Sequence, residues 1–427
     1  MNRWYDQWRG RARTRVLLLA VFLTPITGVL QARLLEKYSV GLLPALDYSS
    51  DKGFGYGILM QLDDKSKAEY SPYFVSHRFV FQQTTKGIAD YSYRFDSKYL
   101  LPGGIRFTLD TRYQVSLFEP FHGPGGAQTD YTEAFTDPDD PDYRGKFYYT
   151  YDRRTNHLRL IFQKNLPQPD LRVLWGIVFQ STKFDSIDYS SNDEPDTLRS
   201  LLANNWNNWQ RYASIYPGGW ENALILGLVY DKRDHELSPR TGFWSEVLMR
   251  WVPGISMNDF EYLAVSATHR QYMRLSDKLV LAGRVSGRYF SENAPFFALS
   301  QVDGSFVTDN GLGGKKTIRG VLWQRVLGYK TAFGNLELRY FAKELFKTGY
   351  VALNLFTDAG RSFDKQVTEF IGSSEEQDQD QLHVGYGIGM HAALSNTFVT
   401  ALDIAFPLNA ELDGSGMKLY IGLDWLF

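Results

Sequence analysis

The 427-residue sequence has no cysteine, only 16 prolines and no strong excess of either charge. Without cysteine, the chain cannot form a disulfide framework, a cysteine zinc site, an iron–sulfur cluster or a cysteine nucleophile. A formal net charge of −2 gives no electrostatic reason to expect nucleic acid as a partner. The mean hydropathy of −0.32 argues against a helical membrane protein, which needs repeated apolar runs of about 20 residues.

Aromatic residues and glycine, by contrast, are abundant. The chain has 10 Trp, 27 Tyr, 29 Phe and 37 Gly. A membrane β-barrel combines such a composition with a low mean hydropathy, because every second residue of each strand faces water. The composition is therefore compatible with a chain that crosses a membrane with strands.

The N-terminal segment has the organisation of an export signal. Five arginines lie between Arg3 and Arg15, and an apolar stretch, 16–30, follows them. This stretch is short for a spanning helix and typical of a signal peptide. We expect a signal peptide over residues 1–32, cleaved after Ala32, and a single barrel domain over residues 40–427. An N-terminal membrane anchor is the alternative.

After residue 40 the chain alternates apolar and polar residues with a period of two, as strands with one apolar face do. The last segment shows this clearly, with one face formed by Met417, Leu419, Ile421, Leu423, Trp425 and Phe427. The pattern predicts sixteen strands, an even number as in bacterial single-chain barrels. Their expected ranges are 40–47, 53–62, 70–80, 90–98, 105–116, 145–163, 171–183, 222–231, 241–251, 260–271, 279–290, 333–341, 349–358, 384–392, 397–406 and 417–427.

The lengths of the connections support an antiparallel barrel. Four long connections, 117–144, 184–221, 291–332 and 359–383, all follow odd-numbered strands, whereas the connections after even-numbered strands are short. Outer-membrane barrels have long loops on one side and short turns on the other. In a barrel this wide, we expect the long loop between strands 11 and 12 to fold into the lumen.

A soluble β-sandwich is the alternative all-β fold. The less apolar faces of the expected strands carry many charges, among them Arg106, Asp110, Arg284 and Asp403. A sandwich core could not hold these charges, whereas the polar lumen of a wide barrel can. The sequence therefore favours an all-β fold, a 16-stranded antiparallel transmembrane β-barrel.

Two expected outer loops carry acidic runs, 136–142 and 375–380. Acidic loop residues can bind Ca²⁺, but Asp137, Asp139 and Asp142 lack the glycine and the distal glutamate of an EF-hand loop. We expect solvated loops, with calcium binding as the alternative, and no metal or other cofactor.

Three motifs occur in the second half of the chain. The first places Asp231, Arg233, Asp234, Pro239 and Gly242 in the short turn between strands eight and nine. The second lies in the long loop after strand eleven and comprises Gly313, Gly314, Ile318, Arg319 and Gly320. The third is the run Phe356-Thr357-Asp358-Ala359-Gly360 at the end of strand thirteen.

With a final strand that ends in Phe427, these motifs resemble those of the outer-membrane assembly and translocation barrels of the BamA/TamA type, the bacterial surface antigen family. The motifs occur in the family's order, and the resemblance is most specific over residues 222–427. The chain departs from the family at Val321, where Phe or Tyr is usual. The span between Ala32 and Val40 leaves no room for POTRA domains, so we expect a barrel-only member.

The resemblance implies that Arg319 lies in the lumen against acidic residues. A buried guanidinium needs a carboxylate partner. We expect Asp358 to be that partner, with Glu337 and Asp403 as alternatives. A solvent-exposed Arg319 is the opposing interpretation. For the first motif, the turn between strands eight and nine, we expect a structural role, with a docking surface for periplasmic partners as the alternative.

The last strand has a second expected role. Ile421, Leu423, Trp425 and Phe427 resemble the recognition strand that the outer-membrane insertion machinery reads by edge pairing. The expected partners are therefore outer-membrane lipid, that machinery during biogenesis, and a separate periplasmic or exported protein.

Three hypotheses for the function follow. The first is a role in the insertion or translocation of proteins at the bacterial outer membrane, through a seam between the first and last strands. The second is a passive pore or structural barrel. The third is an outer-membrane enzyme, which we do not expect, because none of the seven histidines lies in a G-x-S-x-G or H-E-x-x-H context.

Overall fold

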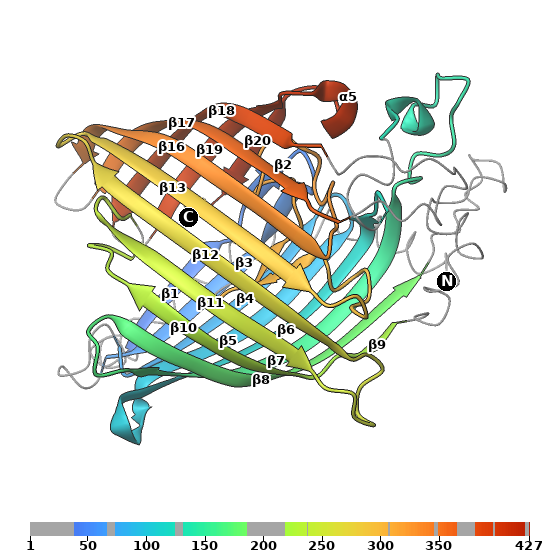
Figure 1. Cartoon of the computed structure of the whole chain (residues 1–427). Coiled ribbons are helices and arrows are strands. Elements are labelled where there is room, and N and C mark those ends of the chain that lie inside the picture. Colours follow the sequence, from blue (N-terminus) through green and yellow to red (C-terminus); the bar gives the residue numbers. More distant parts are fainter. Residues whose placement is uncertain are drawn as a thin grey trace, which may run out of the picture.

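The computed structural model describes residues 38–65, 73–123, 131–185, 218–236, 238–305, 308–345, 349–364, 381–395, 398–422 and 427. They form one closed, antiparallel β-barrel with a tilted wall (Figure 1). The expected signal peptide, residues 1–32, and the acidic run 375–380 lie outside these residues. No helix in the described part of the chain is long and apolar enough to cross a membrane.

The wall is built from strands that follow one another around the barrel in chain order. They are β1 (Tyr38–Pro44), β2 (Asp47–Ser49), β3 (Gly53–Asp64), β4 (Val75–Thr84), β5 (Ile88–Leu101), β6 (Ile105–Pro120), β7 (Thr150–Asn165), β8 (Leu171–Asp185), β9 (Gly218–Trp220), β10 (Ala223–Asp231), β11 (Gly242–Val252), β12 (Tyr262–Arg274), β13 (Leu279–Phe290), β16 (Lys330–Leu345), β17 (Gly349–Ser362), β18 (His383–Ser395), β19 (Phe398–Pro407) and β20 (Lys418–Gly422). A separate hairpin, β14 (Gln301–Asp303) with β15 (Thr308–Asn310), lies within the loop between β13 and β16.

These segments make sixteen wall strands, as the sequence predicts. β1 and β2 both pair with β3 and are two parts of the first strand, interrupted after Pro44. β9 and β10 both pair with β8 and together form the eighth. The sheet closes where β2 pairs with β20. The predicted fold is therefore confirmed, and the interruption after Pro44 is a detail that the period-two pattern did not show.

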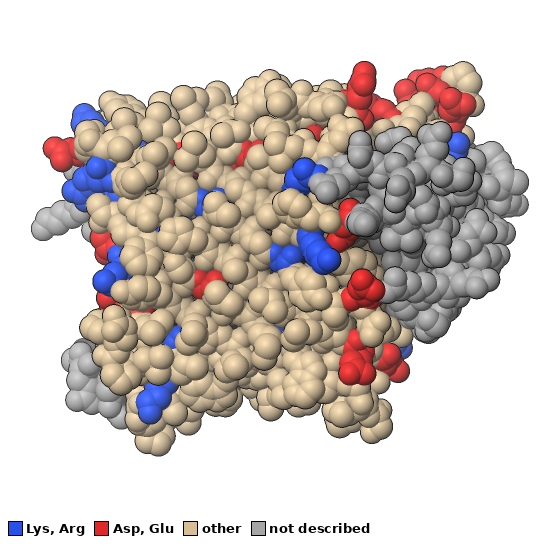
Figure 2. Space-filling model, viewed as in Figure 1, with Lys and Arg blue, Asp and Glu red and all other residues tan. Residues whose placement is uncertain are grey.

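Side chains alternate between the lumen and the outer surface. In β13, Arg284, Ser286 and Arg288 are buried, whereas Val285 and Tyr289 are exposed. In Figure 2 charged side chains gather towards the two ends of the barrel, and few lie on the surface between them. The wall therefore presents an apolar outer band and a polar lumen, which is the arrangement of a membrane barrel.

The two ends of the barrel differ. We call the end that carries the connections after β6, β8, β13 and β17 the long-loop end; it lies at the right in Figure 1. The other, the short-turn end, carries turns such as the 3-10 turn Pro102–Gly104 between β5 and β6. A short helix, α5 (Ala410–Asp413), lies at the long-loop end between β19 and β20.

Candidate functional site

The loop between β13 and β16 runs back into the barrel. Its first part, Ala294 to Leu299, is completely buried in an aromatic cluster at the long-loop end. Phe296 meets the rings of Phe121 and Phe184 edge to face, at 5.1 Å between centroids in each case. Such edge-to-face pairs add to the gain from burying the rings. The cluster therefore fixes the start of the loop against the wall.

Wall side chains hold the loop's backbone further along. Arg288 of β13 donates hydrogen bonds to the carbonyls of Leu299 and Gln301, each at 3.2 Å. Arg284 of the same strand donates to the carbonyl of Lys316 at 2.7 Å. A loop buried in this way needs such partners, because its peptide groups have lost water. We refer to residues 294–327 as the lumen loop.

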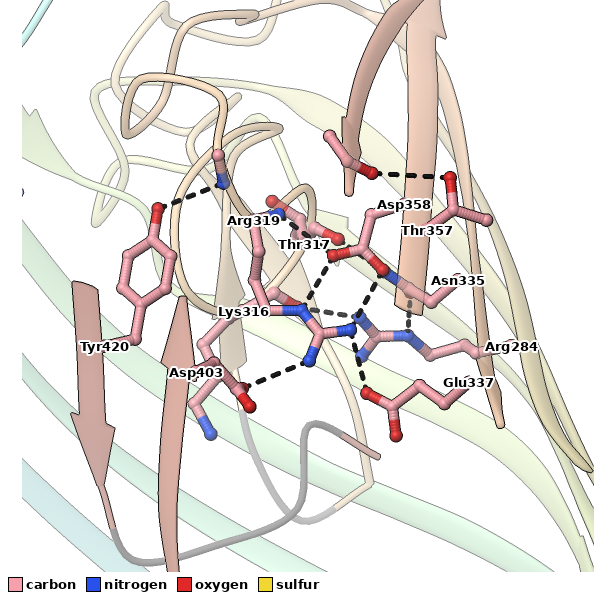
Figure 3. A network of polar contacts seen from close by, with 12 residues as sticks. Arg284, Lys316, Thr317, Arg319, Asn335, Glu337, Thr357, Asp358, Asp403 and Tyr420 are labelled. Atoms are coloured by element: carbon pink, nitrogen blue, oxygen red, sulfur yellow. Dashed lines mark hydrogen bonds and ion pairs between the residues drawn. The ribbon is translucent and has the colours of Figure 1, made fainter. Parts of the chain in front are cut away.

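Arg319 is the centre of a polar network in the lumen loop (Figure 3). Its Nε and Nη2 donate to the two oxygens of Asp358 at 2.8 and 3.1 Å, and its backbone N–H donates to the same carboxylate at 3.0 Å. Nη2 also lies 2.8 Å from Glu337, and Nη1 lies 3.1 Å from Asp403. Phe356 lies under the guanidinium, 3.5 Å from its centre. Arg319 has no exposed surface, and all three acidic residues expected from the sequence contact it together.

Neighbouring strands bring these carboxylates together. Glu337 lies on β16, Asp358 on β17 and Asp403 on β19. Between β17 and β19, the lumen face of β18 carries Gly385, and a Cβ there would collide with the carbonyl oxygen of Arg319. The glycine therefore leaves room for the loop to lie directly on the wall.

Two further side chains contact the acidic residues. Arg339 pairs with Glu337 at 2.8 Å, and His391 contacts Asp403 at 2.9 Å. Arg319 and Arg339 thus face three carboxylates in a volume with almost no water access. Buried charges are tolerated only when partners of opposite charge and hydrogen bonds surround them.

The loop tip is shaped by glycines and by one threonine. Gly313, Gly314 and Gly320 all have positive φ, between 84° and 105°. The hydroxyl of Thr317 accepts from the N–H of Gly313 at 2.9 Å and donates to a carbonyl within the same turn. Ile318 is fully buried in a small apolar cluster beside it. The tip is a rigid turn with both polar and apolar anchors.

The same tip touches the place where the barrel closes. β2 and β20 share two register pairs, Tyr48 with Ile421 and Ser49 with Tyr420, whereas β12 and β13 share eleven. The N–H of Ser50 adds a hydrogen bond to Leu419 at 3.0 Å. We call this junction the seam. Residues 423–426, which follow β20, lie outside the described part of the chain.

The lumen loop is fastened to both sides of the seam. On the β20 side, Lys315 donates to the carbonyl of Ile421 at 2.9 Å, and the N–H of Gly320 donates to the Tyr420 hydroxyl at 3.2 Å. On the β2–β3 side, the ammonium of Lys52 lies over the ring of Trp323, 4.4 Å from its centre. The loop therefore bridges the two edges that close the barrel.

A carboxylate on the β2–β3 turn has an unusual acidity. Burial raises the pKa of Asp51 to about 6, although Lys418, Lys52 and Lys86 lie near it and the backbone N–H of Trp323 donates to it. Desolvation disfavours the charged form of an acid. Asp51, which lies on the β2–β3 turn next to the lumen loop, is therefore a weaker acid than an exposed aspartate.

The turn motif after β10 forms a compact structure at the short-turn end. Arg233 makes a bidentate pair with Asp231, at 2.9 and 3.0 Å. Asp234 accepts from the N–H of Thr241 at 3.2 Å, and Gly242 has a φ of +92°. Pro239 is buried in this turn. These contacts bring the motif residues together in one bonded turn, away from Arg319.

The last residue does not lie where the period-two pattern places it. Ile421 is part of the wall, and Leu423 and Trp425 lie outside the described residues. Phe427, expected on the same apolar outer face, is instead buried, and its ring lies about 5 Å from the guanidiniums of Arg284 and Arg339.

The physical reason for this difference is in the lumen. The cation–π contacts and a hydrogen bond of 3.0 Å from Arg339 to the carbonyl oxygen of Phe427 favour an inward position. A strand pattern cannot indicate such partners, because Arg339 lies 88 residues away in the chain.

Sequence reasoning missed several residues around Arg319. Arg339, His391 and Tyr420 support the network, and Trp323 and Lys315 connect it to the seam. For Tyr420 and His391, the sequence indicated only the side of the strand, because the period-two pattern places both on the lumen face. Within the described ranges, no group of three or more His, Asp or Glu residues is placed to hold a metal ion.

Comparison with known proteins identifies a matching family and similar solved structures. Residues 82–425 match the Omp85 superfamily domain. Among solved structures, BamA from Haemophilus ducreyi lacking POTRA domains 1–3 is similar, with 14% identity, a TM-score of 0.59 and coverage of 91% of this chain and 70% of that chain. CdiB from Escherichia coli is also similar, with 10% identity, a TM-score of 0.52 and coverage of 90% and 63%. No curated protein matches the chain.

Proposed function

The chain belongs to the Omp85 superfamily, and from that premise we propose that it inserts proteins into the outer membrane or moves proteins across it. The protein is an outer-membrane barrel, and we place its long-loop end outside the cell, as outer-membrane barrels have their longer loops there. The similarity to BamA and CdiB shows a shared fold, while the activity is inferred from the features below.

The observation that carries the proposal is the construction of the seam. In the described part of the chain, two register pairs join β2 to β20, and a hydrogen bond from Ser50 adds to them. The first strand is interrupted after Pro44, which has no N–H to donate to a ladder. The other junctions between the described wall strands range from five register pairs, between β19 and β20, to fourteen, between β6 and β7, so the wall would separate first at the seam.

The lumen loop is placed to control the opening of the seam. It is tied to β20 through Lys315 and to the β2–β3 turn through Trp323, so the seam cannot widen without breaking a loop contact. Its other end is fixed to the opposite side of the barrel by the aromatic cluster around Phe296. Lateral opening of the seam would therefore require the loop tip to release one edge.

A disulfide across the seam tests the proposal. The chain has no cysteine, so Tyr48→Cys with Ile421→Cys would form the only possible cross-link. A matched control is Met249→Cys with Val265→Cys, an equivalent register pair between β11 and β12. The readout is assembly of an unfolded eight-stranded barrel reporter into liposomes that contain the purified protein.

We expect oxidation of the seam pair to stop reporter assembly and reduction to restore it, with the control pair active in both states. Full activity of the oxidised seam variant would reject lateral opening. No activity of the unmodified protein above empty liposomes would reject insertion itself.

The substrate would reach the barrel through a separate periplasmic or exported protein. The turn with Asp231 and Arg233 faces the short-turn end, where such a protein would arrive, and its bonded geometry offers a fixed surface. In this proposal the turn serves both structure and docking, and Ile421 to Phe427 serve recognition by the insertion machinery during biogenesis.

A passive, closed barrel is the second candidate. The observation that favours it is the fully buried ion-pair network of Arg319, which fastens the lumen loop to the wall. We do not propose an enzyme, because the two buried His–Asp pairs, His383 with Asp413 and His391 with Asp403, connect packed elements of the barrel as structural pairs do.

A further inference from the structure

A second polar site lies on the other wall of the lumen from Arg319. A cavity of about 160 Å³ is bordered by residues of β3 to β7 and by Ser305 of the lumen loop. Its position follows from the strand register: Arg78, Arg94, Asp110 and Arg159 are paired in sequence across β4, β5, β6 and β7. Such a row of cross-strand partners points to one side of the sheet, here the lumen.

The cavity lies towards the short-turn end. Arg106, which also lines it, is the second residue of β6, two positions after the turn Pro102–Gly104. Ser76, another lining residue, is the second residue of β4. The lumen loop covers the cavity on the long-loop side through Ser305. A solute would therefore reach it from the periplasmic end of the barrel.

Positive charge exceeds negative charge in the lining. Four arginines border the cavity, namely Arg78, Arg94, Arg106 and Arg159, against the two carboxylates of Asp96 and Asp110. Asp63 lies next to the cavity, where it accepts from Ser76 at 2.6 Å. Glu246 lies beside it as well, where it accepts from the N–H of Ser305 at 3.1 Å. With these two neighbouring carboxylates counted, the four arginines are balanced, so an anion would be held here by guanidinium and hydroxyl donors.

The arginines are held in fixed positions. Arg94 pairs with Asp110 at 2.7 Å, and Arg106 pairs with Asp96 at 2.7 Å. Arg159 donates to the carbonyl of Gly304 at 3.3 Å, which connects it to the lumen loop. Guanidiniums that are already oriented lose little side-chain freedom when an anion binds.

An unmatched hydroxyl points to a ligand. Ser305 is 6% exposed and borders the cavity, yet its Oγ has no hydrogen-bond partner in the described structure. A buried hydroxyl without a partner is costly, so a group that accepts its hydrogen bond would be stabilised there. Ser305 therefore offers a donor on the loop side, opposite the arginines of the wall.

We propose that this cavity binds a phosphate group. A phosphate or phosphate monoester carries a charge of about −1 to −2 near neutral pH and has several acceptor oxygens for guanidinium and hydroxyl donors. The cavity has room for roughly five waters at about 30 Å³ each, which accommodates one such group. The group can come from free phosphate or from a lipid headgroup. The site does not depend on the proposed transport function.

Binding to the purified barrel in detergent tests the proposal, with inorganic phosphate and dihexanoylphosphatidic acid as separate probes in titration calorimetry. We expect saturable binding of inorganic phosphate if the source is soluble, and of the lipid probe if it is a headgroup. Arg159→Gln should weaken that binding roughly tenfold or more, because it removes a charged donor. Ser305→Ala should weaken it several-fold.

Two matched variants serve as controls. Arg112→Gln removes an arginine of β6 that pairs with Asp90 and does not line the cavity. Ser300→Ala removes a hydroxyl of the lumen loop that is bonded to Arg153. Both should leave binding unchanged, and heat-modifiable gel mobility should show that every variant is folded.

Ser305→Ala carries particular weight, because its Oγ supports no protein contact whose loss could disturb folding. Absence of saturable binding for both probes would overturn the proposal. Equal affinities of the unmodified protein, Arg159→Gln and Ser305→Ala would also overturn it.

Discussion

At Arg319, one guanidinium faces Asp358, Glu337 and Asp403 in a volume that excludes water. Arg319→Ala would remove the arginine that pairs with Asp358 and Asp403, while Glu337 would keep its pair with Arg339. Removing one partner of a buried ionic network typically costs about 3–5 kcal/mol. We therefore expect a lower urea midpoint for unfolding in lipid vesicles and loss of heat-modifiable mobility at a lower temperature.

Arg319→Lys separates charge from geometry in this experiment. Lysine keeps the positive charge but cannot make the bidentate contact with Asp358, so its stability should lie between those of Arg319→Ala and the unmodified protein. Unchanged stability of Arg319→Ala would show that the network does not hold the loop.

Asp51 gives the barrel a defined pH dependence. Its pKa is raised to about 6 in the folded state, while an aspartate in an unfolded chain titrates near 4. Between these values the folded state binds more protons, so this group makes the barrel more stable as pH falls from about 6 to about 4, by about 1–3 kcal/mol. The gain persists at lower pH.

Urea unfolding at pH 4.5 and pH 7.5 measures this effect. Asp51→Asn should reduce the stability difference between the two pH values, whereas Asp139→Asn, a change in an exposed loop, should leave it unaltered. An equal difference in Asp51→Asn and the unmodified protein would contradict the assignment.

The sequence predicted part of the residue-scale chemistry. It placed Asp358, Glu337 and Asp403 on one face and offered them as alternative partners of Arg319, and the structure brings all three to it. It did not indicate that Tyr420 meets the loop, because the contact with Gly320 joins residues 100 positions apart, nor that Arg339 pairs with Glu337 two positions away on the same strand. Alternation tells which face a residue occupies, but not which loop residue meets it there.

At the scale of elements, the period-two pattern was sufficient to predict the wall. Every expected strand has a counterpart, because alternation is imposed by a wall with water on one side and an apolar phase on the other. The pattern did not predict two features of the wall. The first strand is interrupted after Pro44, and Phe427 turns inward to Arg284 and Arg339.

Phe427 gives the element-scale prediction. Deleting it should lower the amount of assembled protein in the outer membrane, because the strand proposed for recognition would lose its aromatic end and the lumen would lose a cation–π partner. Phe427→Tyr keeps the aromatic ring and should assemble nearly normally. The measurement is the heat-modifiable fraction in isolated outer membranes, and equal fractions for the deletion and the unmodified protein would contradict it.

For the whole molecule, the match to the Omp85 superfamily confirms the family that three short motifs suggested. Those motifs lie in three different connections or strand ends, and the fold brings two of them into contact. The glycine-rich loop tip meets the acidic strand end at Arg319 and Asp358, while the turn motif bonds internally at the opposite end. The sequence could not show the seam contacts of the loop, since they involve Lys52, Lys315 and Trp323, which belong to no recognised motif.

Replacing the lumen loop distinguishes the two candidate functions, protein insertion or translocation and a passive barrel. Replacing residues 300–327 with a flexible Gly–Ser linker removes Arg319 and the seam contacts but keeps the aromatic anchor up to Leu299. If the loop obstructs the lumen, planar-bilayer conductance should rise severalfold over that of the unmodified protein, because polar wall residues would then line an open channel. If the loop also controls the seam, the same variant should differ from the unmodified protein in the rate at which the reporter assembles into liposomes. If conductance rises and neither the unmodified protein nor the linker variant assembles the reporter, the passive barrel is favoured. Unchanged conductance would show that the loop does not obstruct the lumen.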